Sequence, residues 1–126
     1  MALQIGRDFV LPFVIPQTEL LAGTKIDLVA PFDGRVDELQ IVVQGAVTTG
    51  GAITVEVNTV AVAGLSITVA NSATKGTVQS DKPDEPSTSR AFKKGDRLSI
   101  VPAAAFDTAG AINGNLLING SPGEKA

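Results

Sequence analysis

The chain has 126 residues, which fits one domain, and 44% of them are hydrophobic while only 4% are aromatic, so aliphatic side chains must fill most of the core. It contains neither cysteine nor histidine, which excludes disulfides, thiolate metal sites and the side chain that most often serves as a general base. The net charge of −3 argues against nucleic acid as a partner, and no apolar run approaches the roughly 20 residues of a membrane-spanning helix.

An apolar segment at residues 9–16 is the first feature along the chain, and both faces of a strand formed there would be apolar. One face would carry Phe9, Leu11, Phe13 and Ile15, and the other would carry Val10, Pro12, Val14 and Pro16. Because alternate residues of a strand direct their N–H groups to the same edge, the two prolines leave one edge without donors, as in an edge strand or a strand added to another sheet.

Two interpretations of this segment stay open. It is either the first strand of the domain's own sheet or an arm that grips a neighbouring subunit. We define residues 1–23 as an N-terminal extended arm, with a loop or short turn at 17–23. We expect its odd-numbered apolar side chains to bind a partner: Phe9, Leu11, Phe13 and Ile15.

Residues 25–30 are expected to form the next strand, followed by a turn at 31–34 and a strand at 35–44. The inward phase of the second of these strands changes between Val36 and Leu39, and a bulge near Asp37 and Glu38 would reconcile the two phases.

Residues 51–69 alternate apolar and polar side chains, a pattern typical of half-buried antiparallel strands. The same alternation recurs at 97–101. We predict that eight side chains of these two stretches face one interior: Ile53, Val55, Val57, Leu65, Ile67, Val69, Leu98 and Ile100.

The remaining chain reads as short strands and loops. We expect strands at 77–80 and 115–119, an exposed polar loop at 81–90, a small-residue loop at 102–111 and a tight turn at Asn113-Gly114. About eight strands without an amphipathic helix predict an all-β, single-domain antiparallel β-sandwich, jelly-roll-like in form. The sandwich would span residues 24–119, and residues 120–126 would be a flexible tail.

No group of residues in the sequence suggests catalysis. Asp33, Asp37 and Glu38 lie near one expected turn, and Asp81, Asp84 and Glu85 near another, without the spacing of a calcium-binding loop. The serines have no histidine to activate them. We therefore expect a protein that is not an enzyme and that has no catalytic residue, metal or cofactor.

Three stretches of the chain carry a resemblance to a known family: LVAPFDGRVDELQIVVQGAVTTGGAITVEVN, GLSITVANSATKGTV and FKKGDRLSIV. Together they are similar to the small head decoration proteins, also called capsid-cement proteins, of tailed bacteriophages. The resemblance covers residues 26–118 and consists of strand and turn patterns.

The resemblance implies a structural virion protein, made in the host cytoplasm, that binds the outside of the capsid. Its partners would be the major capsid protein and further copies of itself, with a dimer ahead of a trimer, and it would stabilise contacts between shell subunits. A second class stays open, a receptor-binding or adhesion module of a phage fibre or baseplate. Such modules usually carry aromatic or charged loops, whereas these loops are mostly Gly, Ala, Ser and Thr.

Overall fold

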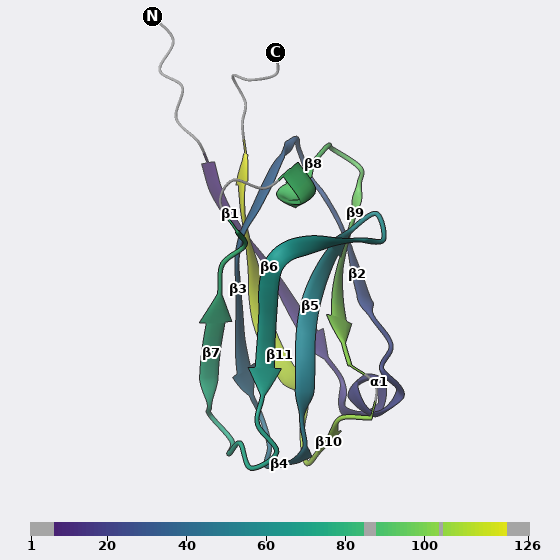
Figure 1. Ribbon diagram of the computed structural model, residues 1–126, viewed down its shortest axis with the longest axis vertical. Helices are drawn as coiled ribbons and strands as arrows, with labels where there is room; N and C mark the ends of the chain where they lie inside the picture. Colours follow the sequence, from purple (N-terminus) through teal and green to yellow (C-terminus); the bar gives the residue numbers. More distant parts are fainter. Residues whose placement is uncertain (1–6, 85–87, 104, 121–126) are drawn as a thin grey trace, which may run out of the picture.

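Strands account for most of the computed structural model, which describes residues 7–84, 88–103 and 105–120 (Figure 1). One sheet, called here the terminal sheet because it holds the first and last strands, has the order β1 (Arg7–Ile15), β11 (Ile112–Gly120), β3 (Gly34–Val43) and β7 (Val78–Asp81), with β8 (Ala91–Phe92) also paired to β3. The second sheet has the order β2 (Ile26–Val29), β9 (Arg97–Pro102), β5 (Gly51–Val57) and β6 (Val60–Val69). Two short strands, β4 (Val47–Thr49) and β10 (Asp107–Thr108), pair separately.

The connectivity of the two sheets is that of a jelly roll. The first main strand pairs with the last (β1 with β11), the second with the second-last (β2 with β9), and likewise β3 with β7 and β5 with β6. The chain is thus one long antiparallel ribbon, rolled so that successive pairs enter opposite sheets. The predicted all-β, jelly-roll-like sandwich is confirmed.

The core lies between the two sheets and is mostly aliphatic, as the composition requires. All eight side chains predicted to share one interior are buried there. They are joined by residues of the terminal sheet such as Leu39 and Leu116, and by Phe106 from the loop after β9. The period of two therefore predicted the inward face of the second sheet correctly.

The bulge expected in β3 is present at Asp37. Glu38 pairs with Leu117 and Val36 pairs with Ile118, so Asp37 has no counterpart on β11. The extra residue allows Val36 and Leu39 to be buried on the same face, which explains the change of phase in the sequence.

Two expected loops contain regular structure. Residues 17–23 begin with the short helix α1 (Gln17–Ala22), which ends at Gly23 in a left-handed conformation and buries Leu20. The expected loop at 102–111 contains β10. Both elements are too short for a periodic pattern to show in the sequence.

The turn predicted at Asn113-Gly114 is wrong, because both residues lie inside β11. Gly114 is opposite Phe13 in the ladder. A Cβ atom at position 114 would overlap the carbonyl oxygen of Gln40 and lie 2.6 Å from the Phe13 ring. The glycine serves the close packing of an aromatic ring rather than a reversal of the chain.

Candidate functional site

The four side chains predicted to bind a partner fall into two groups. Phe13 and Ile15 are 6% and 0% exposed and belong to the core, so neither is available to a partner, and that part of the prediction is wrong. Leu11 is half-buried, and Phe9 is 40% exposed and packs against Phe32 with ring centroids 4.6 Å apart. The reason is pairing within the chain: β1 is an edge strand of the terminal sheet, and its odd-numbered side chains face the second sheet.

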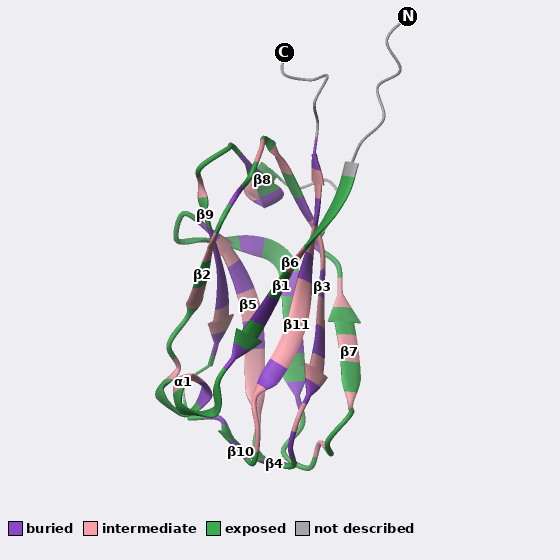
Figure 2. Ribbon diagram, turned by 180° about the vertical axis from the view of Figure 1, so that it is seen from behind, coloured by how far each residue is buried: buried purple, intermediate pink, exposed green. Residues whose placement is uncertain are grey.

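The outward side chains of β1 begin a large, weakly charged surface, called here the terminal face, which Figure 2 views from outside. Across the sheet, paired positions form rows of outward side chains, none of them buried. The rows are Val14, Asn113, Val42 and Val78; then Pro12, Asn115, Gln40 and Ser80; then Val10, Leu117 and Glu38. Glu38 is the one charged side chain in these rows.

The polar side chains of the terminal face are largely unused inside the molecule. Within the described part of the chain, Asn113, Asn115 and Ser80 make no side-chain hydrogen bond, and Gln40 reaches only Glu38, at 3.5 Å. Two shallow hollows lie on this face and share Val42, Gly114 and Asn115 in their walls. The face therefore offers apolar area together with free donors and acceptors.

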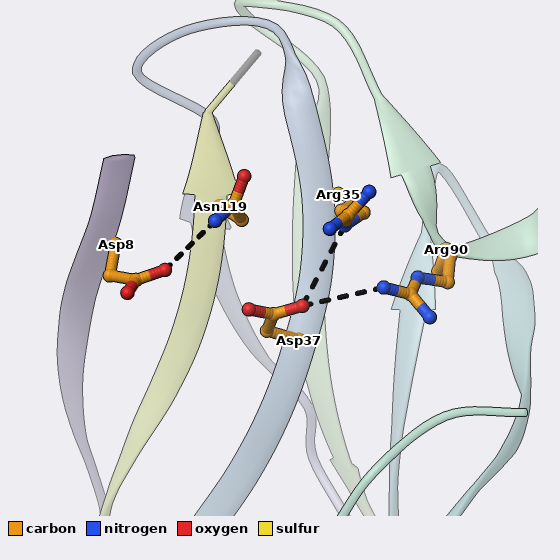
Figure 3. A network of polar contacts seen from close by, with 5 residues as sticks. All are labelled: Asp8, Arg35, Asp37, Arg90 and Asn119. Carbon is orange, nitrogen blue, oxygen red and sulfur yellow. Dashed lines mark hydrogen bonds and ion pairs between the residues drawn. The ribbon is translucent and has the colours of Figure 1, made fainter. Parts of the chain in front are cut away.

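Charged groups gather at the end of the terminal sheet where β1 begins and β11 ends (Figure 3). Asn119 donates to the Asp8 carboxylate at 2.8 Å. The bulged residue Asp37 accepts from Arg90 at 3.3 Å and lies 3.7 Å from Arg35. Arg90 is buried, although the 81–90 tract was predicted to be an exposed loop. The bulge directs a carboxylate to this arginine, and a buried charge needs such a partner.

The outer face of the second sheet is different, because several of its charged side chains have a partner within the sheet. Lys25 forms an ion pair with Glu56 at 3.1 Å, and the Ser99 hydroxyl donates to Asp27 at 2.6 Å. Ser99 lies between Asp27 and Glu56 in the ladder and is fully buried beneath these side chains. Lys25, Asp27 and Glu56 on this surface therefore each have a partner within the molecule.

The two open sides of the sandwich also differ. On one side, β6 is tied to β7 and the segment after it: Ser66 N–H donates to Asp81, Ala63 N–H donates to Ser89, and Gln79 donates to the Thr68 carbonyl. On the other side lie β1 and β2 (Figures 1 and 2). Apolar side chains there are only partly covered, namely Leu11, Ile26, Leu28 and Phe32.

The carboxylate clusters singled out in the sequence hold turns and edges. Asp33 accepts from Lys94 N–H at 2.9 Å, and Asp81 accepts from Ser66 N–H at 2.9 Å, while Glu85 lies outside the described residues. The hydrogen bond from Lys93 N–H, at 2.8 Å, and one from the Asn58 side chain lower the pKa of Asp96. Among the described residues, no three acidic side chains are grouped so that they could hold a metal ion, and none of the helices is long and apolar enough to cross a membrane.

Comparisons with known proteins add little to this picture. No protein-family model matches the chain, and a search of curated proteins finds no match. Among solved structures, the chain is similar to part of the structure of infectious bursal disease virus, Gx strain, with 16% sequence identity and a TM-score of 0.44. The likeness covers 94% of this chain and 33% of that chain, so this chain spans about a third of its length.

Proposed function

We propose that this protein is a non-enzymatic structural component of a phage particle that binds the outside of the capsid and stabilises contacts between shell subunits. The terminal face is the surface that contacts the major capsid protein. The observation that carries the proposal is the contrast between this face, with its apolar rows and unused amides, and the second sheet, where Lys25 pairs with Glu56 and Asp27 accepts from Ser99.

The physical argument starts from the cost of removing water. Desolvating an unpaired charge is far more costly than desolvating an amide or a hydroxyl that finds a new hydrogen bond. The rows that contain Val14 and Pro12 hold no charged side chain. Val10, Val14 and Val78 are each more than half exposed, and covering them removes apolar area from water. Asn113 and Asn115 can donate to and accept from whatever covers them.

The position of the face suits a flat partner. Its side chains come from four neighbouring strands, so they present a broad and regular surface rather than a cleft. A rigid sheet also loses little conformational entropy when it is covered. A shell built of repeated subunits would offer the same broad binding surface many times, because each subunit exposes the same residues.

The test is co-sedimentation of the purified protein with empty capsids of the phage that encodes it. We expect Val78→Asp to reduce capsid occupancy at least tenfold, because a charge would enter the terminal face. Val60→Asp is the matched control: it places the same charge on a valine with 59% exposure, compared with 70% for Val78, in the β5–β6 hairpin. Equal occupancy for both variants, or binding to host cells without binding to capsids, would contradict the proposal. The second of these results would identify an adhesion module.

A further inference from the structure

The β2 edge of the second sheet is not protected by any other part of the described chain. The β6 edge receives hydrogen bonds from the segment that follows β7, and β7 lies on that same side. The β1 edge contains Pro12. Strand β2 has neither a proline nor a side chain bonded to its free edge within the described residues. Exposed edges of this kind are where further strands add.

Pro12 protects β1 because of the direction in which its missing N–H group would point. Val43 N–H donates to the Thr77 carbonyl. The backbone N–H and C=O groups of odd-numbered residues near this end of β3 therefore point toward β7, and those of even-numbered residues point toward β11. The paired positions carry this alternation across the sheet, so the backbone groups of Gly114 point toward β1 and those of Phe13 point toward β11. Pro12 therefore faces the free edge, where it removes a donor from the middle of the strand.

The same reasoning identifies the free groups of β2. Ala30 N–H donates to Asp96 beside β9, so the even residues of this strand face β9. The backbone N–H and C=O groups of Asp27 and Val29 consequently point away from the sandwich, and the same alternation places those of Lys25, just before β2, on this edge. They offer alternating donors and acceptors to an antiparallel strand.

A second copy of β2 fits this edge in one favoured register. A symmetric antiparallel pair centred on Asp27 would place Asp27 opposite itself, which is destabilising for like charges. A pair centred on Leu28 would place Asp27 opposite Val29. A pair centred on Ile26 places Lys25 opposite Asp27 of the second copy, twice by symmetry, and brings the two half-buried Ile26 side chains together.

We propose that the protein forms a two-fold homodimer through antiparallel pairing of residues 25–27, at the start of β2, with the same residues of a second copy, centred on Ile26. Lys25 already bonds Glu56, and Asp27 already accepts from Ser99, but an ammonium has three donors and a carboxylate has two oxygens. Both side chains can therefore hold a partner across the dimer axis. The interface adds main-chain hydrogen bonds to a small contact area, so we expect a dissociation constant in the micromolar range.

This arrangement has a geometric consequence. The two-fold axis of an antiparallel strand pair is perpendicular to the sheet, so the four-stranded second sheets join into one sheet of eight strands. The two terminal faces then point to the same side of the dimer. Resting on the proposed function, this means that one dimer contacts a capsid through two terminal faces at once, which raises its apparent affinity without new contacts.

The dimer can be tested by a charge exchange followed by analytical ultracentrifugation. Lys25→Asp leaves two acidic side chains at the edge, and Asp27→Lys leaves two basic ones. We expect each variant alone to dimerise at least tenfold more weakly than the wild type, because both cross-axis pairs become repulsive. An equimolar mixture of the two variants restores both attractive pairs. We therefore expect a heterodimer to form at the protein concentrations at which the wild type dimerises.

The mixture separates pairing between copies from damage within one copy, since each variant loses an internal contact whether or not the other is present. Lys75→Asp, in an exposed loop, is the control for charge change and should dimerise like the wild type. A monomeric wild type, or a mixture that remains monomeric, would overturn the dimer. A wild-type dimer that fails to sediment with capsids would leave this inference intact and refute the proposed function.

Discussion

The two outer faces of this sandwich enclose one core but treat their polar groups in opposite ways. On the second sheet, Lys25 forms an ion pair with Glu56, and Asp27 accepts a hydrogen bond from Ser99. On the terminal sheet, Asn113 and Asn115 have no side-chain partner in the described chain and stand among exposed valines. Polar side chains without a partner inside the molecule can form hydrogen bonds to a partner that covers them, and covering the valines around them removes apolar area from water. This difference, rather than any reactive group, indicates where the molecule works.

The largest effect should come from the core, where the two faces should not differ. Leu116 lies beneath the terminal face and Ile67 beneath the other, and both are buried. We expect Leu116→Ala and Ile67→Ala each to lower the free energy of unfolding by about 2–5 kcal/mol. Urea denaturation measures both. A loss below 1 kcal/mol at Leu116 alone would mean that the terminal sheet packs loosely, and its outer rows could not then form a rigid surface.

A smaller loss of stability is expected at Gly114, where β11 packs closely against the neighbouring strands of the terminal sheet. Gly114→Ala would drive a methyl group into the Gln40 carbonyl and the Phe13 ring, so we expect a loss of about 1–3 kcal/mol. Asn115→Ala, the next residue and directed outward, is the control and should change the free energy of unfolding by less than about 0.5 kcal/mol. Equal changes in the free energy of unfolding for the two substitutions would contradict the pairing of Gly114 with Phe13.

The sequence predicted the core better than the surfaces, and the reason is physical. Alternation reports which side of a strand is apolar, so Ile53 and Ile67 could be assigned inward without knowing their neighbours. The phase change between Val36 and Leu39 likewise predicted the bulge at Asp37. Both faces of β1 are apolar, however, and only its pairing with β11 decides that Phe13 is core while Val14 is surface.

The wrong predictions of a turn at Asn113-Gly114 and of an exposed Arg90 have the same cause, a contact with a residue far away in the sequence. Asn-Gly is a strong local signal for a hairpin, but the contact of Gly114 with Phe13, about 100 residues earlier in the chain, overrides it. Arg90 is buried because Asp37, on a distant strand, supplies its charge partner. Neither contact has a local pattern, and the terminal face, assembled from four strands far apart in sequence, has none either.

A gain in stability is expected at the hairpin that ends the second sheet. Asn58 and Thr59 both have positive φ, 49° and 75°, which suits a tight hairpin turn but is unfavourable for the β-branched Thr59. We expect Thr59→Gly to raise the free energy of unfolding by about 0.5–1 kcal/mol in urea denaturation, since glycine adopts this conformation without strain. Ser66→Gly, in the interior of β6, should lower it instead. Because the change lies far from the terminal face, capsid binding should be unaltered.

The smallest effect concerns pH and the turn that leads into β9 of the second sheet. Asp96 precedes β9, and its carboxylate is stabilised by hydrogen bonds from Lys93 N–H and the Asn58 side chain, which hold its pKa below the ordinary value of 3.8. The folded protein therefore releases this proton at a lower pH than the unfolded chain does. The stabilisation is complete well above pH 3.8 and is lost as the pH falls through the lower pKa of the folded state. Asp96→Asn removes the titrating group, so the difference in the free energy of unfolding between wild type and variant should shrink as the pH is lowered from 6 to 3. Urea denaturation at a series of pH values measures this difference, and a difference that stays constant would show that the Asp96 carboxylate is not engaged in the folded turn.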